Sequence, residues 1–414
     1  MKMFFQTKKK KESFPERLNK RANRNAVLAG FLGWMLDAFD FFILVFVLVD
    51  IAKEFNKSVP EMALTITATL LMRPVGALIF GLLADRYGRK GPMMITIVFF
   101  SLIEVLSGLA PNYMVFIILR LLYGIGMGGE WGLGASLVME SVPAKRRGLL
   151  SGLLQEGYAV GYLLAAVVYY FIFPHFGWRV MFFIGGVPAL LTLFIRARVK
   201  ESEVWKSNRM KDWKSYFQTA GKHWKLFLYL VVLMSAMNLI SHGTQDLYPT
   251  FLKEQLHHST HEVAIITMIS MFGAILGGLL FGSLSDKWGR RRMITIAIFL
   301  GIAMIPLWIY TGSMTIVAIG AFGMQFMVQG AWGIIPAHIN ELSPGQLRGF
   351  FPGFAYQLGV VAASGIAYYE AILAQHLSYS ASMAILAGSV FLLGAIAIIA
   401  GPEAKGVSFI KNGK

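Results

Sequence analysis

Long apolar runs occur about twelve times along the chain, and each is near the roughly 20 residues that an α-helix needs to cross a bilayer. Because a backbone in hydrocarbon must satisfy its own hydrogen bonds, such runs fold as transmembrane helices. We place the spans at residues 26–50, 62–84, 92–110, 113–139, 148–173, 178–196, 226–250, 262–284, 292–311, 314–338, 349–372 and 381–401. The predicted fold class is therefore an all-α membrane protein with twelve transmembrane helices.

Two separated blocks of sequence recur at one offset of 201 residues. Segment 81–90, GLLADRYGRK, returns at 282–291 as GSLSDKWGRR. Trp131, Glu140 and Arg147 return as Trp332, Glu341 and Arg348. A shared offset indicates two similar halves in parallel order, an arrangement in which the halves rock about a central site. We expect a basic N-terminal segment at 1–25, six-helix bundles at 26–196 and 226–401, a linker at 197–225 and a tail at 402–414.

Positive charge is concentrated on one side of the predicted membrane. Basic clusters at 8–11, 145–147 and 290–292 all fall on that side, together with the linker. Lys and Arg mark the cytoplasmic face, so we expect both termini to be cytoplasmic. The formal net charge of +16 is then a signal of topology, and no nucleic-acid partner is expected because no reading module accompanies the basic segment. The linker is predicted to carry a short amphipathic helix.

Segment 81–90 resembles the G-x-L-A-D-R-x-G-R-K signature of the major facilitator superfamily, and 282–291 is where that family keeps a second copy. The resemblance covers the whole chain and implies the superfamily's twelve-helix fold, two pseudo-symmetric six-helix halves and alternating access. The residues themselves indicate that Gly88 allows a tight turn and that Asp85 can face the positive end of a neighbouring helix.

Charge pairs are expected at both copies of this signature. Arg89 and Lys90 could pair with Glu140, and Arg290 could pair with Glu341. Such pairs would hold the inner side shut in an outward-open state; the alternative is that the charges only anchor topology. The candidate gate residues are Asp85, Arg89, Glu140, Asp286, Arg290 and Glu341.

Charged side chains inside spans cost free energy in hydrocarbon and usually line a cavity. Among them are Asp37 and Asp40 in span one, Arg73 in span two, Arg120 and Glu130 in span four, and Glu156 in span five. Asp37 and Arg73 fall near one depth, so an ion pair is expected. We favour a functional role for Asp37, Asp40 and Arg73 over a buried pair that only joins helices. Arg120 is expected to pair structurally with Glu130 or Glu156.

A polar stripe runs along span seven within residues 238–250. At 100° per residue its members fall within an arc of about 140°, so they should face the central cavity; the alternative is a polar seam between helices. The members are Asn238, Ser241, His242, Gln245 and Asp246. The offset of 201 places Asn238 opposite Asp37 and Ser241 opposite Asp40.

Segment 238–250 resembles the pattern N-x-x-[S/T]-H-x-[S/T]-Q-D-x-x-x-T of Jen-type carboxylate/proton symporters, within the sialate:proton symporter family, and matches every specified position. Segment 36–42 is similar to the first span of that family. The resemblance implies proton-coupled uptake of short monocarboxylates such as lactate or pyruvate. It also implies that Asn238, His242, Gln245 and Asp246 line the substrate path.

The negative charge of a carboxylate cargo suggests roles for these residues. A carboxylate entering the membrane needs a cation, for which Arg73 is the candidate, and a proton that neutralises the cargo. The candidate proton carriers are Asp37, Asp40, His242 and Asp246, since His changes charge in the physiological range. Gln357, with Gln325 and Gln329, would complete the binding site with neutral hydrogen bonds.

Other functions are also compatible with this sequence. The same fold could carry a larger organic anion such as sialic acid or an aromatic acid, or could serve as a non-transporting membrane sensor or scaffold. An enzyme is not expected, because no nucleophile, metal cluster or nucleotide loop is visible, and no cofactor is expected beyond the coupling proton. The chain has no cysteine, hence no disulfide. The expected protein is a monomer in a bacterial inner membrane, with a small organic anion, the proton and the lipid bilayer as partners.

Overall fold

The computed structural model describes residues 14–409, apart from residues 58, 188, 209–211 and 375. The basic cluster at 8–11 and residues 410–414 of the tail therefore lie outside the described residues. The first half comprises α1 (Phe14–Glu54), α2 (Val59–Tyr87), α3 (Lys90–Gly108), α4 (Tyr113–Ser141), η1 (Ala144–Arg146), α5 (Arg147–Gln155), α6 (Gly157–Ile184) and α7 (Ala189–Arg198). The helices α8 (Glu203–Asn208) and α9 (Trp213–Lys222) connect the halves. The second half comprises α10 (Trp224–Gln245), α11 (Tyr248–Glu254), α12 (Thr260–Trp288), α13 (Arg290–Trp308), α14 (Met314–Trp332), α15 (Ile335–Leu342), η2 (Gly345–Leu347), α16 (Phe351–Ala363), α17 (Ile366–Ala374) and α18 (Tyr379–Ala400).

The described helices account for the twelve predicted spans. Ten helical stretches are long and apolar enough to cross a membrane. Of the shorter apolar helices, Phe171–Ile184 reaches from the end of span five into span six, and Phe351–Ala363 lies within span eleven. Span eleven is divided because α16 ends before Ser364 and α17 resumes at Ile366. No strand occurs among the described residues, so the all-α prediction is confirmed.

Several predicted spans besides span eleven, among them spans five and ten, are interrupted where we expected continuous helices. In span five, α5 ends at Gln155 and α6 begins at Gly157. The helix α6 then runs on past residue 173 into span six through a kink at Gly177, whose φ is 71°. Span ten is divided at Gly333, between α14 and α15. Glycine tolerates the backbone conformations that such interruptions require.

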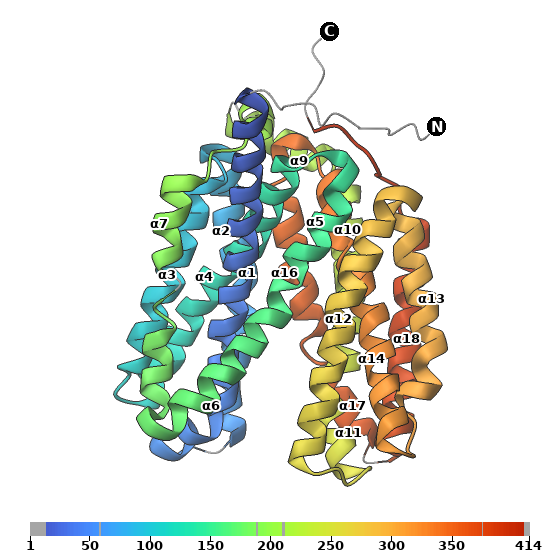
Figure 1. Ribbon diagram of the computed structural model, residues 1–414. Helices are drawn as coiled ribbons and strands as arrows, with labels where there is room; N and C mark the ends of the chain where they lie inside the picture. Colours follow the sequence, from blue (N-terminus) through green and yellow to red (C-terminus); the bar gives the residue numbers. More distant parts are fainter. Residues whose placement is uncertain (1–13, 58, 188, 209–211, 375, 410–414) are drawn as a thin grey trace, which may run out of the picture.

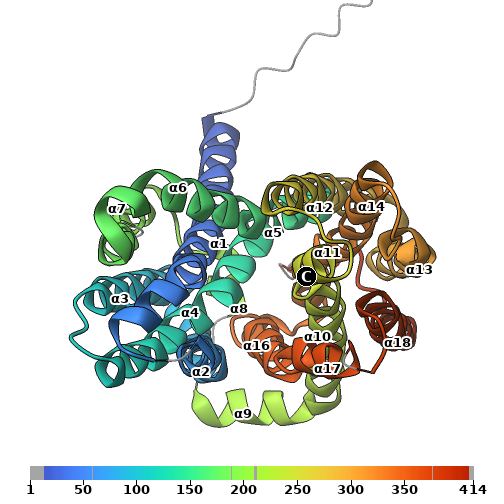
Figure 2. The same ribbon diagram turned by 90° about the horizontal axis from the view of Figure 1, so that it is seen from below.

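The helices form two bundles (Figures 1 and 2). In the first bundle α1 packs on α6 and α2 on α4, and in the second α10 packs on α16 and α12 on α14. The bundles adjoin at the end of the molecule where α1 begins and α9 lies, which we call the terminal face. They diverge toward the opposite end, where α6 and α11 lie, which we call the open face.

Contacts between the halves are reciprocal: α5 packs on α12, and α16 packs on α2. Glycines bring the first pair close together. A Cβ atom at Gly148 would collide with the carbonyl oxygen of Gly282, and one at Gly152 with that of Gly278. Gly148 and Gly152, four residues apart, therefore allow α5 and α12 to pack closely.

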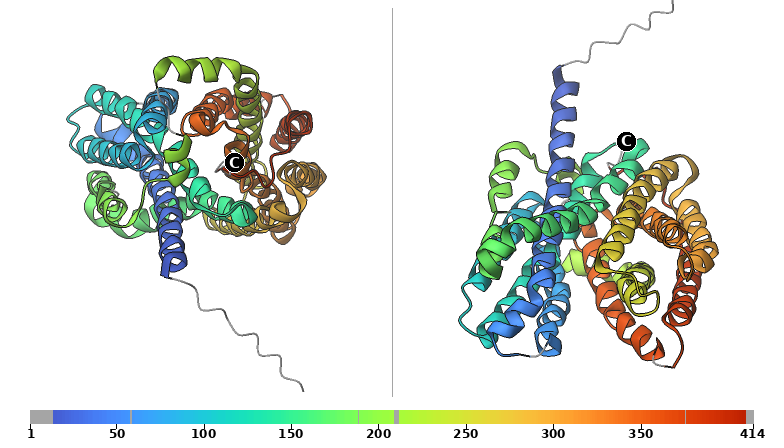
Figure 3. Two further views of the ribbon diagram at one scale, coloured as in Figure 1. Left: turned by 90° about the horizontal axis from the view of Figure 1, so that it is seen from above. Right: turned by 60° about the horizontal axis from the view of Figure 1, so that its bottom comes forward.

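The amphipathic helix predicted in the linker is α9, which lies between α2 and α10 at the edge of the molecule (Figures 2 and 3). Its Tyr216 side chain is buried, whereas Trp213 and Phe217 are exposed. Asp212 caps the N-terminus of α9, because its carboxylate accepts a hydrogen bond from the Ser215 N–H at 2.8 Å.

Candidate functional site

Two connected chambers lie between the bundles. The inner chamber has a volume of about 80 Å³ and is lined from both halves, including Arg73 and Tyr158 of the first half and His242 and Gln245 of the second. The outer chamber has a volume of about 380 Å³. Tyr158 and Gln245 line both chambers, so they mark the passage from one to the other.

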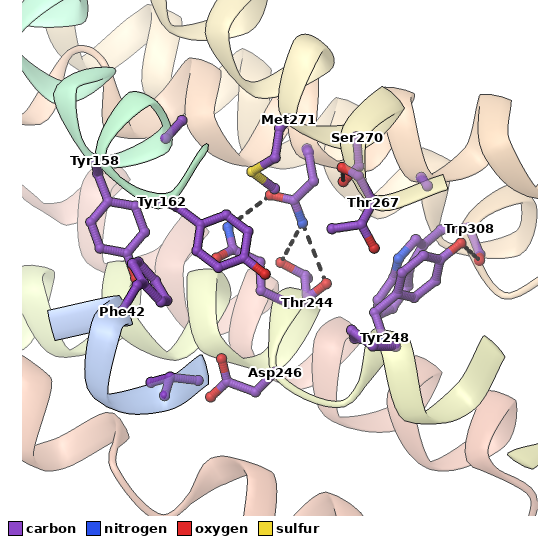
Figure 4. Close-up of a pocket in the computed structure, with 16 residues that line it drawn as sticks. Phe42, Tyr158, Tyr162, Thr244, Asp246, Tyr248, Thr267, Ser270, Met271 and Trp308 are labelled. Carbon is purple, nitrogen blue, oxygen red and sulfur yellow. Dashed lines mark hydrogen bonds between the residues drawn. The ribbon is translucent and has the colours of Figure 1, made fainter. Parts of the chain in front are cut away.

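Aromatic rings dominate the outer chamber. Figure 4 shows Phe42, Tyr158 and Tyr162 on one side and Tyr248 and Trp308 on the other. The polar side chains that reach this chamber are Thr244, Gln245, Asp246, Thr267, Ser270 and Gln325. Such a lining holds an organic molecule by its apolar surface and orients it through few hydrogen bonds.

Arg73 contributes a partly unsatisfied cation to the inner chamber. Its Nε donates a hydrogen bond to Gln357 Oε1 at 2.9 Å, whereas Nη2 has no hydrogen-bond partner among the described residues. The side chain is buried, being 5% exposed. A guanidinium with a free N–H edge is suited to a carboxylate.

The prediction of an ion pair between Asp37 and Arg73 is wrong. Both carboxylate oxygens of Asp37 lack a hydrogen-bond partner among the described residues, so Asp37 forms no hydrogen-bonded ion pair with Arg73 there. The physical reason is that Gln357 approaches from the other half and binds the guanidinium. Asp37 and Asp40 are fully buried and contribute to the lining of neither chamber.

The polar stripe of span seven faces the chambers, as the helical periodicity predicts. Asn238, Ser241, His242 and Gln245 line the inner chamber. His242 Nδ1 lies 3.1 Å from Asp246 Oδ2, so the two side chains of one helical turn form a hydrogen bond. Gln245 Nε2 donates to Gln325 Oε1 at 2.8 Å, which fixes the far side of the stripe against α14.

Arg120 does not pair with Glu130 or Glu156, and that expectation is wrong. Its Nη2 lies 2.8 Å from Glu104 Oε2 and also donates to Ser107. Glu104 is a lone acid in the apolar span three, and the sequence offered no signal that α3 would bring it to α4. A Cβ atom at Gly185 would lie 3.2 Å from an Asp40 carboxylate oxygen and would collide with Glu104 Cγ, so both side chains lie beside Gly185.

Several buried carboxyl groups remain without partners. Glu130 has both oxygens unpartnered among the described residues, as has Glu370 of α17, which sequence reasoning did not select. Glu156, at the interruption between α5 and α6, has an unpartnered Oε1. The described residues contain no group of three or more His, Cys, Asp and Glu side chains arranged to hold a metal ion.

At the terminal face, the first copy of the repeated signature forms a buried charge network. Arg89 lies 2.6 Å from Asp85 and 3.0 Å from Glu140. Asp85 also accepts hydrogen bonds from the Gly349 and Phe350 N–H groups at 2.8 and 3.1 Å. These N–H groups immediately precede α16, so Asp85 faces the positive end of a helix in the other half, as predicted.

The second copy of the signature has the same geometry, with the roles of the two halves exchanged. Arg290 lies 2.8 Å from Asp286 and 3.0 Å from Glu341. Asp286 accepts hydrogen bonds from the Gly148 and Leu149 N–H groups, in the first turn of α5, at 2.8 and 3.1 Å. Each half therefore binds a helix N-terminus of the other. Gly88 and Gly289 close the two turns with φ of 108° and 102°, so the predicted tight turn is confirmed.

The linker reinforces the first copy. The Tyr216 hydroxyl of α9 donates a hydrogen bond to Asp85 Oδ2 at 2.9 Å. Burial, and then the neighbouring Asp85 carboxylate, raise the pKa of Tyr216, so the hydroxyl keeps its proton and remains a donor.

The segment after α18 forms a strap across the terminal face that sequence reasoning missed. The ring of Phe409 lies between Arg147 and Arg348, with each guanidinium carbon 3.7 Å from the ring centroid. Arg147 also donates to the Val407 carbonyl at 3.0 Å. Because Arg147 and Arg348 are offset partners from different halves, Phe409 joins the halves at a symmetry-related pair.

Comparisons with known proteins agree with this architecture. The model of the Major Facilitator Superfamily matches residues 30–245, and that of the Sugar (and other) transporter family matches residues 203–413. The carboxylic acid transporter protein homolog of Saccharomyces cerevisiae is 30% identical over 92% of this chain and 68% of its own length. The sialic acid transporter NanX of Escherichia coli (strain K12) is 31% identical over 83% of this chain and 85% of its own.

A solved structure of the proton:xylose symporter XylE has a TM-score of 0.78 and covers 94% of this chain and 98% of its own. At 20% identity this likeness concerns the fold alone. The chain belongs to the Major Facilitator Superfamily. It is an integral membrane transporter and not an enzyme, and its relatives include proteins named as transporters of organic acids.

Proposed function

We propose that this chain is a proton-coupled symporter of short monocarboxylates such as lactate and pyruvate, working by alternating access. The observation that carries the proposal is Arg73. It lines an inner chamber of about 80 Å³, and its Nη2 has no partner among the described residues. A buried cation with a free N–H edge in so small a space is suited to an acid of few carbon atoms.

The proton would be handled beside this cation. His242 lines the same chamber and is hydrogen-bonded to Asp246, which reaches the outer chamber. A carboxylate that enters with one proton carries no net charge. In this mechanism His242 and Asp246 take the proton from the open face, and Asp37 and Asp40 are further candidate carriers within the first bundle.

The paired signatures act as the gate in this proposal. The residues Asp85, Arg89 and Glu140, with their partners Asp286, Arg290 and Glu341, hold the terminal face closed while both chambers stay accessible from the open face. By the distribution of positive charge the terminal face is cytoplasmic, and the protein lies in a bacterial inner membrane.

The resemblance of segment 238–250 to the Jen-type pattern and the yeast relative named as a carboxylic acid transporter support this substrate class. The alternative cargo is a larger organic anion such as sialic acid or an aromatic acid. It is supported by the aromatic outer chamber of about 380 Å³ and by the relative named as a sialic acid transporter.

Counterflow in proteoliposomes tests the choice of substrate. Vesicles are preloaded with one unlabelled acid from a panel, and entry of labelled lactate is measured without a proton gradient. We expect lactate, pyruvate, acetate and propionate to drive entry, and sialic acid and benzoate not to do so. Vesicles that contain Arg73→Gln protein serve as the matched control. Counterflow by sialic acid or benzoate alone would favour the alternative cargo.

A further inference from the structure

Glu156 lies in the seam between the two halves. Gly148, Gly152 and Glu156 recur at every fourth residue, so they share the face of α5 that packs on α12. A Cβ atom at Gly278 of α12 would collide with the Glu156 carboxyl group. The carboxyl group therefore occupies the space that a side chain at position 278 would fill. The residue is 4% exposed, and its Oε1 has no hydrogen-bond partner among the described residues.

The internal repeat allows the contact between α5 and α12 to be compared with the equivalent contact between α16 and α2, which contains an arginine. The offset of 201 pairs Glu156 with Gln357 and Ala274 with Arg73. In the seam formed by α16, Gln357 accepts a hydrogen bond from Arg73 at 2.9 Å. In the seam formed by α5, alanine stands at the position of the arginine and an acid at the position of the amide. The Glu156 carboxyl group therefore has no cation where its counterpart has one.

The helices that contact α5 supply no compensating charge. Between residues 265 and 285 α12 has no charged side chain, and α14 has none along its length. The other elements in contact carry charged or ionisable side chains that include Asp37 and Asp40 on α1, Arg120, Glu130 and Glu140 on α4, Lys145 and Arg146 on η1, Arg179 on α6, and His338 and Glu341 on α15. Among the described residues none of these forms a hydrogen bond or ion pair with Glu156, and at the terminal face Arg147 and Arg290 bind Glu341 instead.

An ionised carboxylate buried without a partner is strongly disfavoured, so Glu156 keeps its proton while the seam is closed. When the halves separate at the terminal face, α5 parts from α12 and water can stabilise the ionised form. We propose that Glu156 is a proton-carrying group of the transport cycle, which holds a proton in the conformation seen here and releases it when the terminal face opens. The direction of net proton movement rests on the proposed function.

Thermodynamic linkage makes this proposal testable without substrate, because a proton bound in one conformation must favour that conformation. The chain has no cysteine, so spin labels can be placed at will. Tyr87→Cys and Trp288→Cys place labels at two exposed offset partners beside the gate turns. We expect electron–electron distances that lengthen as the pH rises. In the Glu156→Gln background the short distance should persist at both acidic and alkaline pH.

Glu130→Gln is the matched control, since it also removes a buried unpaired carboxyl group but from a position inside the first bundle. It should retain the pH-dependent change in distance. Should Glu156→Gln fail to insert, Glu156→Asp replaces it and is expected to move the midpoint of the change. A parent protein without any change, or a Glu156→Gln protein that changes like the parent, would overturn the proposal. Failure of lactate counterflow with the distance change intact would instead reject the proposed substrate.

Discussion

Two buried arginines of the first bundle have opposite surroundings. Arg120 is saturated by Glu104 and Ser107, and its guanidinium carbon lies 4.5 Å from the centre of the Tyr123 ring. Arg73 donates one hydrogen bond to Gln357, and its Nη2 has no hydrogen-bond partner among the described residues. A satisfied buried charge holds structure together, whereas an unsatisfied one at a chamber wall indicates a ligand. The sequence predicted a structural role for Arg120 and a substrate-binding role for Arg73, but it predicted the wrong partner for each.

Arg73 is expected to be needed for carboxylate binding. Arg73→Ala and Arg73→Gln should weaken lactate binding by about 100-fold, because truncating one member of a buried charge pair costs about 2–5 kcal/mol. Arg73→Lys should retain part of the affinity, since lysine keeps the charge but loses the planar fork. Calorimetry on purified protein measures these affinities. Near-normal lactate binding by Arg73→Ala would reduce Arg73 to a structural partner of Gln357.

Arg120 is expected to be needed for stability. Arg120→Met leaves Glu104 buried without its cation and should lower the free energy of unfolding by about 3–5 kcal/mol. Adding Glu104→Gln should recover much of that loss, because the double variant has no buried unpaired charge. Thermal unfolding in detergent compares the three proteins. If Arg120→Met unfolds like the parent but cannot bind lactate, Arg120 belongs to the substrate path.

Among the elements, the helices α5 and α16 carry the contacts that join the halves, because each presents its N-terminus to an aspartate of the opposite bundle. Asp85→Asn or Asp286→Asn should leave the protein folded and inserted but shift it toward a state open at the terminal face. An aspartate at a helix N-terminus contributes about 0.3–2 kcal/mol, enough to change populations severalfold. Alkylation of a cysteine introduced at the open face should slow. Unchanged alkylation together with parental uptake would exclude the gating role.

The strap formed by Phe409 belongs to the same face. Phe409→Ala removes two cation–π contacts, each worth about 0.5–2 kcal/mol, and should let the terminal face open more often. Phe409→Leu keeps apolar bulk without a ring and should behave like the alanine variant. A Ser151→Cys reporter, buried where Ser151 binds the Ala337 N–H, should then react faster with a water-soluble maleimide. Equal reaction rates in all three backgrounds would show that the strap does not restrain the halves.

For the whole molecule, the defining property is coupling between proton and cargo. Lactate accumulation should be driven by an inward proton gradient and should stop when a protonophore collapses that gradient. It should not depend on the membrane potential, since lactate that enters with one proton carries no net charge. His242→Ala and Asp246→Asn should each impair accumulation, while a variant defective only in coupling retains exchange of labelled for unlabelled lactate. If both variants accumulate lactate normally, Asp37 and Asp40 become the carriers to test.

Much of this architecture could be predicted from local pattern. Spans depend on runs of about 20 apolar residues, the stripe of span seven on helical periodicity, and the gate pairs on a repeat with one offset. The partners of Arg120 and Arg73 could not be predicted in this way. Asp37 was expected for Arg73, and Glu130 or Glu156 for Arg120, but the actual partner of each arginine depends on how the helices rotate and cross. Glu104 and Phe409 had no motif that would have singled them out.

The sequence by itself determined the class of fold, the twofold internal repeat and the face of span seven that lines the chambers, because hydrophobic burial and helical period act on neighbours along the chain. Only the tertiary structure decided which charges are paired and which are left unpaired. Gln357 binds Arg73 from the other half, and Glu104 pairs with Arg120. Glu156 lies against Gly278, whereas its offset partner Gln357 binds an arginine. Pairing energies fall steeply with distance, and those distances exist only once the two bundles are packed together.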